Sequence, residues 1–330
     1  MKKRDVLLSM EDVCISFDTQ WGVVRAVRNL NLQIKKGETL ALVGESGCGK
    51  SITAHAINRL IPMPPGRIEK GKILFNNKDL QGLSDAQMCD IRGEQISMIF
   101  QEPMTSLNPV FRIGNQIADV FLAHHQISKK ESMKMAIKLL ELVKIPSPSQ
   151  RAKSYPHQLS GGMRQRVMIA MALASPNPGL LIADEPTTAL DVTIQAQILT
   201  LVNEIKSKID MSVLFISHDM GVIAEVAERV IVMYAGRKVE EADVFSIFER
   251  PKHPYTLGLL NSMPSNKKYE KAARLETISG NVPEILGLGE GCPFENRCSR
   301  RIKKCKNSFP DKTQLEKDHF VWCFNPKEKK

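Results

Sequence analysis

Apolar and polar residues alternate in short stretches between residues 6 and 35. Alternation with a period of two is typical of strands that bury one face. The apolar positions are Val13, Ile15 and Phe17, then Val23, Val24, Ala26 and Val27, then Leu30, Leu32 and Ile34. The pattern therefore predicts a system of antiparallel strands that leads into a turn at Gly37-Glu38.

Compact apolar runs further along the chain predict buried strands, because they are too short for helices. They cover residues 39–43, 72–75, 96–100, 180–183 and 213–217. The last three runs end directly before polar residues with metal-binding or proton-transfer chemistry. Ligands of open α/β sheets collect at the carboxyl ends of the strands, so these residues mark a functional edge.

Residues 106–158 carry a different pattern, from which strand signals are absent. Residues 131–144 repeat apolar side chains at helical spacing, which predicts a helix that packs one face into a core. A Pro-Ser-rich break follows at residues 146–149, and Ser160 has the side chain of an N-cap for a helix that continues through Ala172. These signals predict a mainly helical subdomain over about residues 106–172.

Residues 44–51 form the strongest chemical motif, G-x-x-x-x-G-K-S, between a predicted strand and a predicted helix over residues 52–60. Glycines let the backbone wrap a phosphate, and a helix N-terminus adds the positive end of its dipole. Lys50 is expected to reach the β- and γ-phosphates, and the Ser51 hydroxyl to bind Mg²⁺. The expected phosphate-binding residues are Gly44, Glu45, Ser46, Gly47, Cys48, Gly49, Lys50 and Ser51.

Polar side chains follow the other predicted strands. The pair Asp184-Glu185 suits Mg²⁺ binding by one carboxylate and activation of water by the other. Gln101 can reach a metal or an attacking water, and His218 a phosphate oxygen, although each alone has a structural alternative. The predicted helix start at Ser160, Gly161 and Gly162 offers a second anion-binding surface, with a plain capped helix as the alternative.

Length and composition fit a globular protein with one large and one smaller domain, or two ordinary ones: 330 residues, 42% hydrophobic and 25% charged. The chain shows neither an apolar run long enough for a membrane span nor a secretion signal, which predicts a cytoplasmic location. Residues 297–330 hold 11 Lys and Arg against 4 Asp and Glu, +7 of the net charge of +10. Such a tail fits nucleic acid or an anionic membrane, but a solvated basic surface is the simpler interpretation.

Four of the seven cysteines gather near the C-terminal end with the spacing C-x₅-C-x₆-C-x₁₇-C, at Cys292, Cys298, Cys305 and Cys323. In a cytoplasmic protein such a group binds a metal more often than it forms disulfides. Zn²⁺ and an iron–sulfur cluster both fit four thiolates, and His319 is an alternative ligand. Unliganded reduced thiols are the simplest alternative. The remaining cysteines are isolated, and the simplest interpretation is that they act as small apolar side chains in the core.

Taken together, these motifs resemble those of the ATP-binding subunit of an ABC transporter, over residues 6 to about 250. The matching residues follow the family's order: the loop 44–51, Gln101, the signature Leu159-Ser160-Gly161-Gly162, the Asp184-Glu185 pair, the Ala189-Leu190-Asp191 turn and His218. Met163 stands where many members carry Gln, which leaves Ser160 and Gly162 in place.

The resemblance implies an α/β fold of the phosphate-loop NTPase class. An ABC ATP-binding domain over residues 1–250 would combine a RecA-like core, an antiparallel β subdomain and a helical subdomain. A small Cys-rich extension over residues 251–330 would follow. In this family two ATPase subunits close head to tail on two ATP molecules, and hydrolysis resets the closed pair.

The resemblance also implies a role for each site residue. Residues 44–51 would bind ATP, and Ser160, Gly161 and Gly162 would complete the ATP site on the partner subunit. From the pattern alone an aromatic at Phe17 or Trp21 fits either adenine stacking or the core, but Phe17 stands at the family's adenine-stacking position.

For hydrolysis, the resemblance implies that Glu185 is the general base. His218 would hold the γ-phosphate and the attacking water. Ser51, Asp184 and Gln101 would bind Mg²⁺, and Gln101 would in addition sense the γ-phosphate and link it to the helical subdomain.

Two stretches resemble oligopeptide and dipeptide importers in particular: Gln101 to Pro109, and His253-Pro254-Tyr255-Thr256 at the start of their C-terminal extension. This implies an ATPase at the cytoplasmic face of the inner membrane that powers peptide uptake, although importers of nickel, glutathione or other small solutes share both features. The implied partners are two permeases, contacted by residues near 101–122, a second ATPase, usually a paralogue, and an extracytoplasmic solute-binding protein. Importers of this kind with such a tail carry a [4Fe–4S] cluster, which favours that cluster over Zn²⁺.

A soluble ABC-type ATPase acting on nucleic acid or ribosomes is the rival interpretation, suggested by the basic tail. One ATPase domain and the absence of a long heptad insertion speak against it, so no nucleic-acid partner is expected. A catalytically inactive regulatory subunit is also disfavoured, because every expected catalytic position is filled.

Overall fold

The computed structural model describes residues 4–101, 106–175, 178–187, 191–209, 211–263 and 277–327. Contacts between residues divide the chain into two compact units that interleave along the sequence. Unit 1 comprises Met1–Arg4, Lys35–Glu38 and Gly82–Leu214, and unit 2 comprises Asp5–Ile34, Thr39–Gln81 and Phe215–Lys330. The last division falls inside a strand, so the units are not simple halves of the sequence.

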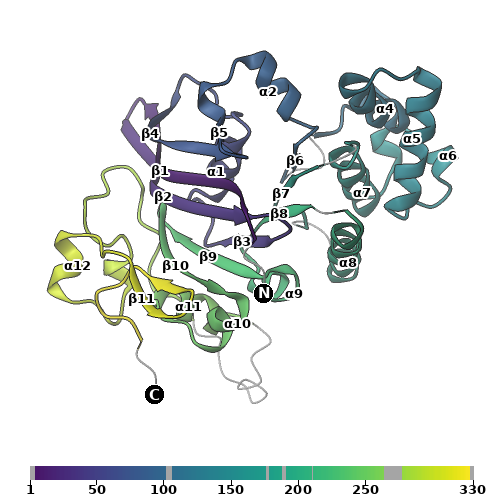
Figure 1. Cartoon of the computed structure of the whole chain (residues 1–330). Helices are drawn as coiled ribbons and strands as arrows, with labels where there is room; N and C mark the ends of the chain where they lie inside the picture. Colours follow the sequence, from purple (N-terminus) through teal and green to yellow (C-terminus); the bar gives the residue numbers. More distant parts are fainter. Residues whose placement is uncertain are drawn as a thin grey trace. The chain divides into compact units, whose positions relative to one another are not determined.

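Unit 2 contains the strands predicted from the alternating pattern. They form a sheet of order β2-β1-β4-β5, with β1 at Val6–Thr19, β2 at Gly22–Lys35, β4 at Gly66–Phe75 and β5 at Lys78–Asp79 (Figure 1). Strands β1 and β4 pair antiparallel. Asn76 and Asn77 join β4 to β5 with φ of 47° and 62°, the left-handed region that tight two-residue turns require. The strand prediction is confirmed, although β4 begins earlier than the predicted run.

A second sheet runs through unit 2 in the order β8-β3-β9-β10-β12-β11, starting from the last residues of β8. Its strands are β3 (Thr39–Val43), β8 (Ser212–Ser217), β9 (Arg229–Tyr234), β10 (Arg237–Asp243), β11 (Thr313–Glu316) and β12 (His319–Val321). Strands β3 and β9 run parallel, whereas β10 runs antiparallel to β9 and β12. Both β3 and β8 are buried throughout, as their apolar runs predict. The hairpin β11–β12 was not predicted, because its strands are short and β11 is mostly exposed.

The helices of unit 2 are short, and the first four start at glycine or side-chain caps. They are α1 (Lys50–Ile57), α9 (Met220–Val226), α10 (Val244–Glu249), α11 (Pro254–Asn261) and α12 (Lys303–Asn307), with the 3₁₀ turns Leu80–Gly82 and Glu295–Arg297. Helix α1 begins two residues before the predicted start because Gly49, in the left-handed conformation, ends the phosphate loop and serves as its N-cap.

Unit 1 carries the other predicted strands, β6 (Ile96–Ile99) and β7 (Leu180–Asp184), next to the first residues of β8. Strands β6 and β7 run parallel, with Ile99 opposite Ala183. Their carboxyl ends therefore lie side by side at one edge of the sheet, which is where the sequence places Gln101 and the Asp184-Glu185 pair.

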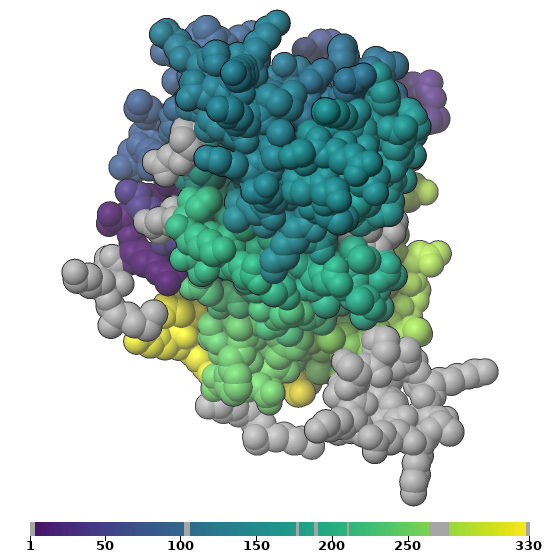
Figure 2. All heavy atoms as spheres, turned by 90° about the vertical axis from the view of Figure 1, so that its right-hand side faces the viewer, coloured from purple at the N-terminus to yellow at the C-terminus, as the bar shows by residue number. Residues whose placement is uncertain are grey.

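The rest of unit 1 is helical: α2 (Asp85–Ile91), α4 (Ile113–His124), α5 (Lys129–Leu142), α6 (Pro148–Arg151), α7 (Gly161–Ala172) and α8 (Val192–Lys208), with a 3₁₀ turn at Pro156–Gln158. Helices α4, α5 and α7 pack on one another, and their segment forms the continuous teal surface of Figure 2. Helix α5 starts at Lys129 because the Ser128 hydroxyl accepts a hydrogen bond from the Glu131 N–H at 3.2 Å. The predicted stripe is its core face, with Ala136 and Leu140 fully buried.

Candidate ATP site

The phosphate loop lies between β3 and α1 in unit 2, and its shape requires glycine at defined positions. Gly44, Gly47 and Gly49 have φ of +152°, +79° and +99°. A Cβ at Gly44 would lie 2.2 Å from the carbonyl oxygen of Met233, and one at Gly49 would lie 2.5 Å from that of Ala26. Because neighbouring backbone fills the space of a Cβ, only glycine fits Gly44 and Gly49.

Lys50, the first residue of α1, turns its ammonium group into the arc of the loop. It is 4% exposed, and Nζ donates to the carbonyl oxygens of Gly44 at 2.7 Å and Glu45 at 3.0 Å. The buried Cys48 beside it has a pKa raised mainly by burial, so its thiol stays neutral. A cation held at the N-terminus of a helix, within a loop of backbone amides, suits a phosphate chain.

Gln101 and Glu185 meet in unit 1, at the carboxyl ends of β6 and β7. Gln101 Nε2 donates to Glu185 Oε2 at 3.0 Å. Asp184 and Glu185 are 2% and 8% exposed. The backbone of Glu185 has φ of 47°, a conformation that residues other than glycine rarely adopt and that clusters at functional sites. The structure thus brings two separately predicted residues, Gln101 and Glu185, into contact, and the roles assigned to them remain predictions.

The signature residues lie at the start of α7, also in unit 1. The Ser160 hydroxyl accepts a hydrogen bond from the Met163 N–H at 3.3 Å and so caps the helix, as predicted. Gly161 is exposed and a Cβ there would meet open space, whereas Gly162 packs against α8. In unit 2, His218 follows β8 directly and is exposed. These positions are accessible to ligand or partner.

The predicted adenine-stacking residue, Phe17, is half-buried on β1, and its ring edge lies against Gly66. Trp21 is 75% exposed in the turn between β1 and β2. Parts of two predicted stretches, residues 102–105 and 189–190, lie outside the described residues. The described end of the second stretch, Asp191, caps α8 by accepting from the Ile194 N–H at 2.9 Å.

The stretch His253-Pro254-Tyr255-Thr256 opens α11. His253 is its N-cap, and Nδ1 accepts from the Tyr255 N–H at 3.1 Å. Burial lowers the pKa of His253 to about 4, which keeps the ring neutral and able to accept. Buried Glu240 accepts from the N–H groups of Lys252 and His253 at 2.7 and 2.9 Å. Glu240 also lies 2.7 Å from Nε2 of His319, so this histidine contacts a carboxylate within the fold.

Sequence reasoning missed two residues that contact the phosphate loop from the C-terminal extension. Arg297 forms a two-pronged ion pair with Glu45 at 2.7 and 3.0 Å, and the Tyr255 hydroxyl accepts from the Glu45 N–H at 2.7 Å. The partners lie 252 and 210 residues apart in the chain, beyond the reach of any local pattern. Tyr255 belongs to the stretch that resembles the importers' extension, but that stretch did not predict a contact with the phosphate loop.

The four C-terminal cysteines lie close enough to influence one another. Burial first, and then the neighbouring thiols, raise the pKa of Cys292 to about 12 and that of Cys323 to about 11. The Cys292 N–H donates to the carbonyl oxygen of Cys305 at 2.7 Å. Across the part of the chain that the structure describes, however, no three His, Cys, Asp or Glu side chains are arranged to hold a metal ion. The arrangement thus supplies neighbouring thiols but no ligand set.

Comparisons with known proteins show the family of the chain. Residues 27–188 match the ABC transporter family, and residues 239–305 match the oligopeptide/dipeptide transporter C-terminal region. The chain is 52% identical to the oligopeptide transport ATP-binding protein OppD of Bacillus subtilis (strain 168), over 97% of this chain and 89% of that protein. It is 50% identical to the dipeptide transport ATP-binding protein DppD of the same strain, over 96% and 94%.

Among solved structures, the ATP-binding cassette MJ0796 in a dimeric post-hydrolysis state, bound to ADP and Pi, resembles the chain with a TM-score of 0.65. The two are 28% identical, and the match covers 72% of this chain and 99% of that one. The predicted α/β fold of the ABC ATPase type is therefore confirmed.

A phosphate loop, a carboxylate pair at a strand end and a capped signature helix on this fold define an ATP-hydrolysing ATPase of the ABC class. The chain belongs to the family of ABC transporter ATP-binding proteins, in the group with the oligopeptide/dipeptide transporter C-terminal region. Among its described helices, none is both long and apolar enough to cross a membrane.

Proposed function

We propose that the chain is the ATPase subunit that powers uptake of oligopeptides or dipeptides through an importer at the cytoplasmic face of the cell membrane. The match of residues 239–305 to the C-terminal region of oligopeptide/dipeptide transporters carries this proposal. The chain is 52% and 50% identical, over nearly its full length, to proteins named for oligopeptide and dipeptide transport, which supports the same cargo class.

In the proposed ATP site, the loop 44–51 and Lys50 hold the phosphates, and Phe17 stacks on the adenine. Ser51, Asp184 and Gln101 supply oxygen ligands for Mg²⁺, which offsets phosphate charge when bound. The buried loop lysine and the glycine-only backbone support the phosphate assignment.

For hydrolysis we propose Glu185 as the general base. Water attacks the γ-phosphorus, its proton passes to the Glu185 carboxylate, and the bond from the γ-phosphorus to the bridging oxygen breaks, releasing ADP and phosphate. The hydrogen bond from Gln101 fixes the direction of one Glu185 oxygen. His218 would hold the γ-phosphate and the water in place.

Two exposed surfaces support the proposed partners. We propose that Ser160, Gly161 and Gly162 bind the ATP held by a second ATPase, a paralogue, and the open space at Gly161 leaves room for it. Permeases would contact the segment before α4, where Val110 and Phe111 are 71% and 52% exposed. Apolar side chains that protrude in this way are typical of protein contacts. A solute-binding protein would join through the permeases.

Purification of the tagged chain from gently solubilised membranes tests the proposal. Two multi-span permeases and a second ATPase should accompany it, and uptake assays with di- and oligopeptides, nickel and glutathione should then show peptide transport. A chain that arrives with ribosomes or nucleic acid and without permeases would refute the importer. Recovery of the permeases together with nickel or glutathione uptake alone would refute only the peptide cargo.

We also propose that Cys292, Cys298, Cys305 and Cys323 bind a [4Fe–4S] cluster, with Zn²⁺ as the alternative. The support is chemical: burial, and after it the neighbouring thiols, raise the pKa of Cys292 and Cys323, and four thiolates suit either group. The described arrangement is not itself a ligand set, so binding would have to draw the thiols together.

Anaerobic purification followed by iron, sulfide and zinc analysis tests the cluster. The wild-type protein should be brown, with broad absorbance at about 400 nm, and Cys298→Ser should lose the metal. Cys89→Ser changes an exposed cysteine outside the group and should keep it. Colourless protein with stoichiometric zinc would exclude the iron–sulfur cluster, and protein with neither metal would exclude both.

A further inference from the structure

We infer that Arg297 and Tyr255, in the C-terminal extension, are positioning residues for the phosphate loop: they hold Glu45 and so fix the loop before ATP arrives. The inference rests on the proposed role of the loop in ATP binding. Neither residue is assigned a contact with ATP, and both act through Glu45.

Arg297 is built into the fold rather than lying on the surface. Its side chain is 6% exposed, against 26% for its partner Glu45. Besides the ion pair, Nη1 donates to the Tyr234 hydroxyl at 3.1 Å, Nη2 to the Ile278 carbonyl at 3.3 Å and Nε to the Ser279 carbonyl at 3.1 Å. A guanidinium bonded from several sides has one orientation, so it holds the Glu45 carboxylate in one place.

Tyr255 holds the backbone of the same loop residue. The side chain is fully buried, and its ring centroid lies 4.6 Å from that of Tyr234 and 5.4 Å from that of Phe294. This packing fixes the hydroxyl that accepts from the Glu45 N–H at 2.7 Å. The Glu45 carbonyl oxygen in turn accepts from Lys50, so the carboxylate, N–H and carbonyl of Glu45 are all engaged.

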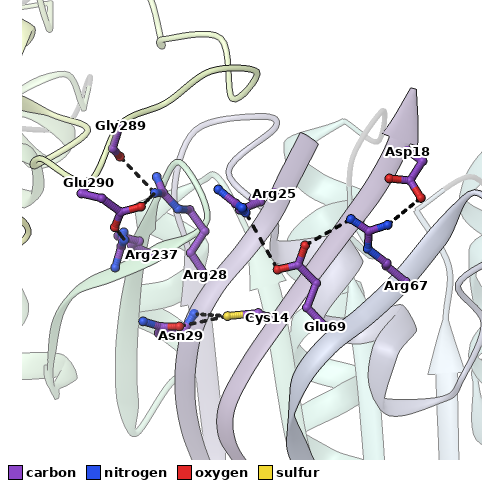
Figure 3. A network of polar contacts seen from close by, with 10 residues as sticks. All are labelled: Cys14, Asp18, Arg25, Arg28, Asn29, Arg67, Glu69, Arg237, Gly289 and Glu290. Atoms are coloured by element: carbon purple, nitrogen blue, oxygen red, sulfur yellow. Dashed lines mark hydrogen bonds and ion pairs between the residues drawn. The ribbon is translucent and has the colours of Figure 1, made fainter. Parts of the chain in front are cut away.

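The contacts of Arg297 and Tyr255 with Glu45 are called the tether below. The extension is also attached at a second point, which keeps the tether from moving with the loop. Figure 3 shows Gly289 and Glu290 beside two buried arginines of the strands. Arg28 donates to the Gly289 carbonyl at 3.0 Å, and the Glu290 carboxylate lies 3.7 Å from Arg28 and 3.6 Å from Arg237. Both arginines are largely buried, and burial lowers their pKa. The extension is therefore anchored on β2 and β10 independently of Glu45.

A loop held in place before binding does not have to be ordered by ATP. If Glu45 were released, the loop would lose conformational entropy when ATP orders it, and this loss would add to the free-energy cost of binding ATP. The tether should therefore act on ATP affinity, and much less on the chemical step, because Arg297 and Tyr255 do not belong to the proposed hydrolytic groups. A change in ATP affinity without a change in the chemical step therefore distinguishes a positioning role from a catalytic one.

The test compares Arg297→Ala, Glu45→Gln and the double variant in the assembled transporter. Arg297→Ala should raise the KM for ATP by about 10-fold or more, the effect of one charged hydrogen-bonding partner, with kcat within about twofold. The KM of the double variant should not exceed that of the more affected single variant, because both substitutions remove the same contact. Hydrogen exchange of residues 44–51 should become faster, while that of β3 stays unchanged.

A matched control belongs to the same extension. Arg301→Ala removes a cation that is 58% exposed and contacts neither Glu45 nor the second anchor. It should leave the KM within about twofold, since surface ion pairs contribute little. Tyr255→Phe removes only the hydroxyl and keeps the ring packing, so it reports on the tether even if Arg297→Ala fails to fold.

Unchanged KM and exchange in both Arg297→Ala and Tyr255→Phe would overturn the inference, as would strictly additive effects of Arg297→Ala and Glu45→Gln. Tighter ATP binding by these variants would do the same, because it would mean that the tether opposes the bound loop. A wild-type transporter that does not hydrolyse ATP would refute the proposed function instead.

Discussion

At the scale of single residues, Glu45 and Glu185 show how the partner decides what a carboxylate can do. Arg297 binds Glu45 through two hydrogen bonds, and these bonds raise the pKa of the guanidinium, so Arg297 stays charged. Glu185 accepts a hydrogen bond from the amide of Gln101. An amide orients a carboxylate without adding a charge. The first contact suits the anchoring inferred for Glu45, and the second is compatible with the proposed role of Glu185 as general base.

Replacement of Glu185 tests the base. Glu185→Gln keeps the side chain's size and its place beside Gln101 but cannot accept a proton from water. We expect ATP binding within about twofold of wild type and hydrolysis slower by about 10²- to 10⁴-fold, the usual contribution of a general base. The measurements are nucleotide affinity and steady-state ATPase rate in the purified transporter.

Glu204→Gln provides the matched control, because Glu204 lies on α8 in an exposed ion pair with Lys144. It should hydrolyse ATP at the wild-type rate. A near-normal rate in Glu185→Gln would show that another group accepts the proton.

At the scale of elements, the caps decide where helices start and how α11 depends on pH. His253 caps α11 with a neutral ring nitrogen, and burial lowers its pKa from 6.5 to about 4, against an opposing effect of Glu240. A histidine with a lowered pKa in the folded state binds protons more readily when unfolded. The stabilisation is therefore complete above about pH 6.5 and is lost as the pH falls towards 4.

The His253 cap predicts that the free energy of unfolding falls as the pH is lowered, and that His253→Asn reduces this fall. Asparagine keeps an acceptor for the cap but does not titrate. Wild-type protein should lose on the order of 2 kcal/mol of unfolding free energy between pH 7.5 and pH 5 through this residue, and His253→Asn should lose correspondingly less. Denaturant unfolding across this pH range measures the difference.

His157→Asn, an exposed histidine in the 3₁₀ turn before α7, is the control and should follow the wild-type pH dependence. Equal pH dependence of wild type and His253→Asn would mean that His253 is not the titrating group.

At the scale of the whole molecule, exposed apolar side chains indicate where the proposed partners would contact the chain. Phe111 is 52% exposed directly before α4, in the segment proposed to contact the permeases. Phe111→Glu would place a charge in that contact, and burial of an unpaired charge is costly. We expect at least about tenfold less permease recovered with the tagged subunit, and peptide uptake reduced to match.

Phe245→Glu changes another exposed phenylalanine, 64% exposed on α10 in unit 2, and should leave assembly intact. Both variants should bind ATP as the wild type does. Full permease recovery with Phe111→Glu would place the contact elsewhere.

Much of the fold was predictable because it depends on short-range rules. The strand β3, buried throughout, was predicted residue by residue from its apolar run, and the cap at Ser160 from its side chain. Strand and helix ends were less predictable, as at β4, where the apolar run marks only the half of the strand that packs into the core. The hairpin β11–β12 was not predicted, because its strands are short and β11 is mostly exposed, so no apolar run marks them.

By itself, the sequence determined the phosphate loop and the strand-end carboxylates, because glycine, lysine and acidic residues at fixed local spacing can serve few other chemistries. It also determined the family, which the comparisons confirmed. Only the tertiary structure decided which distant groups meet. The pairing of Gln101 with Glu185, the buried Glu240 between two segments of the extension, and the hold of Arg297 on Glu45 all depend on the folding of remote stretches against one another. Such contacts leave no periodic trace in the chain, because the energy of an ion pair or hydrogen bond depends on distance in space and not on separation in sequence.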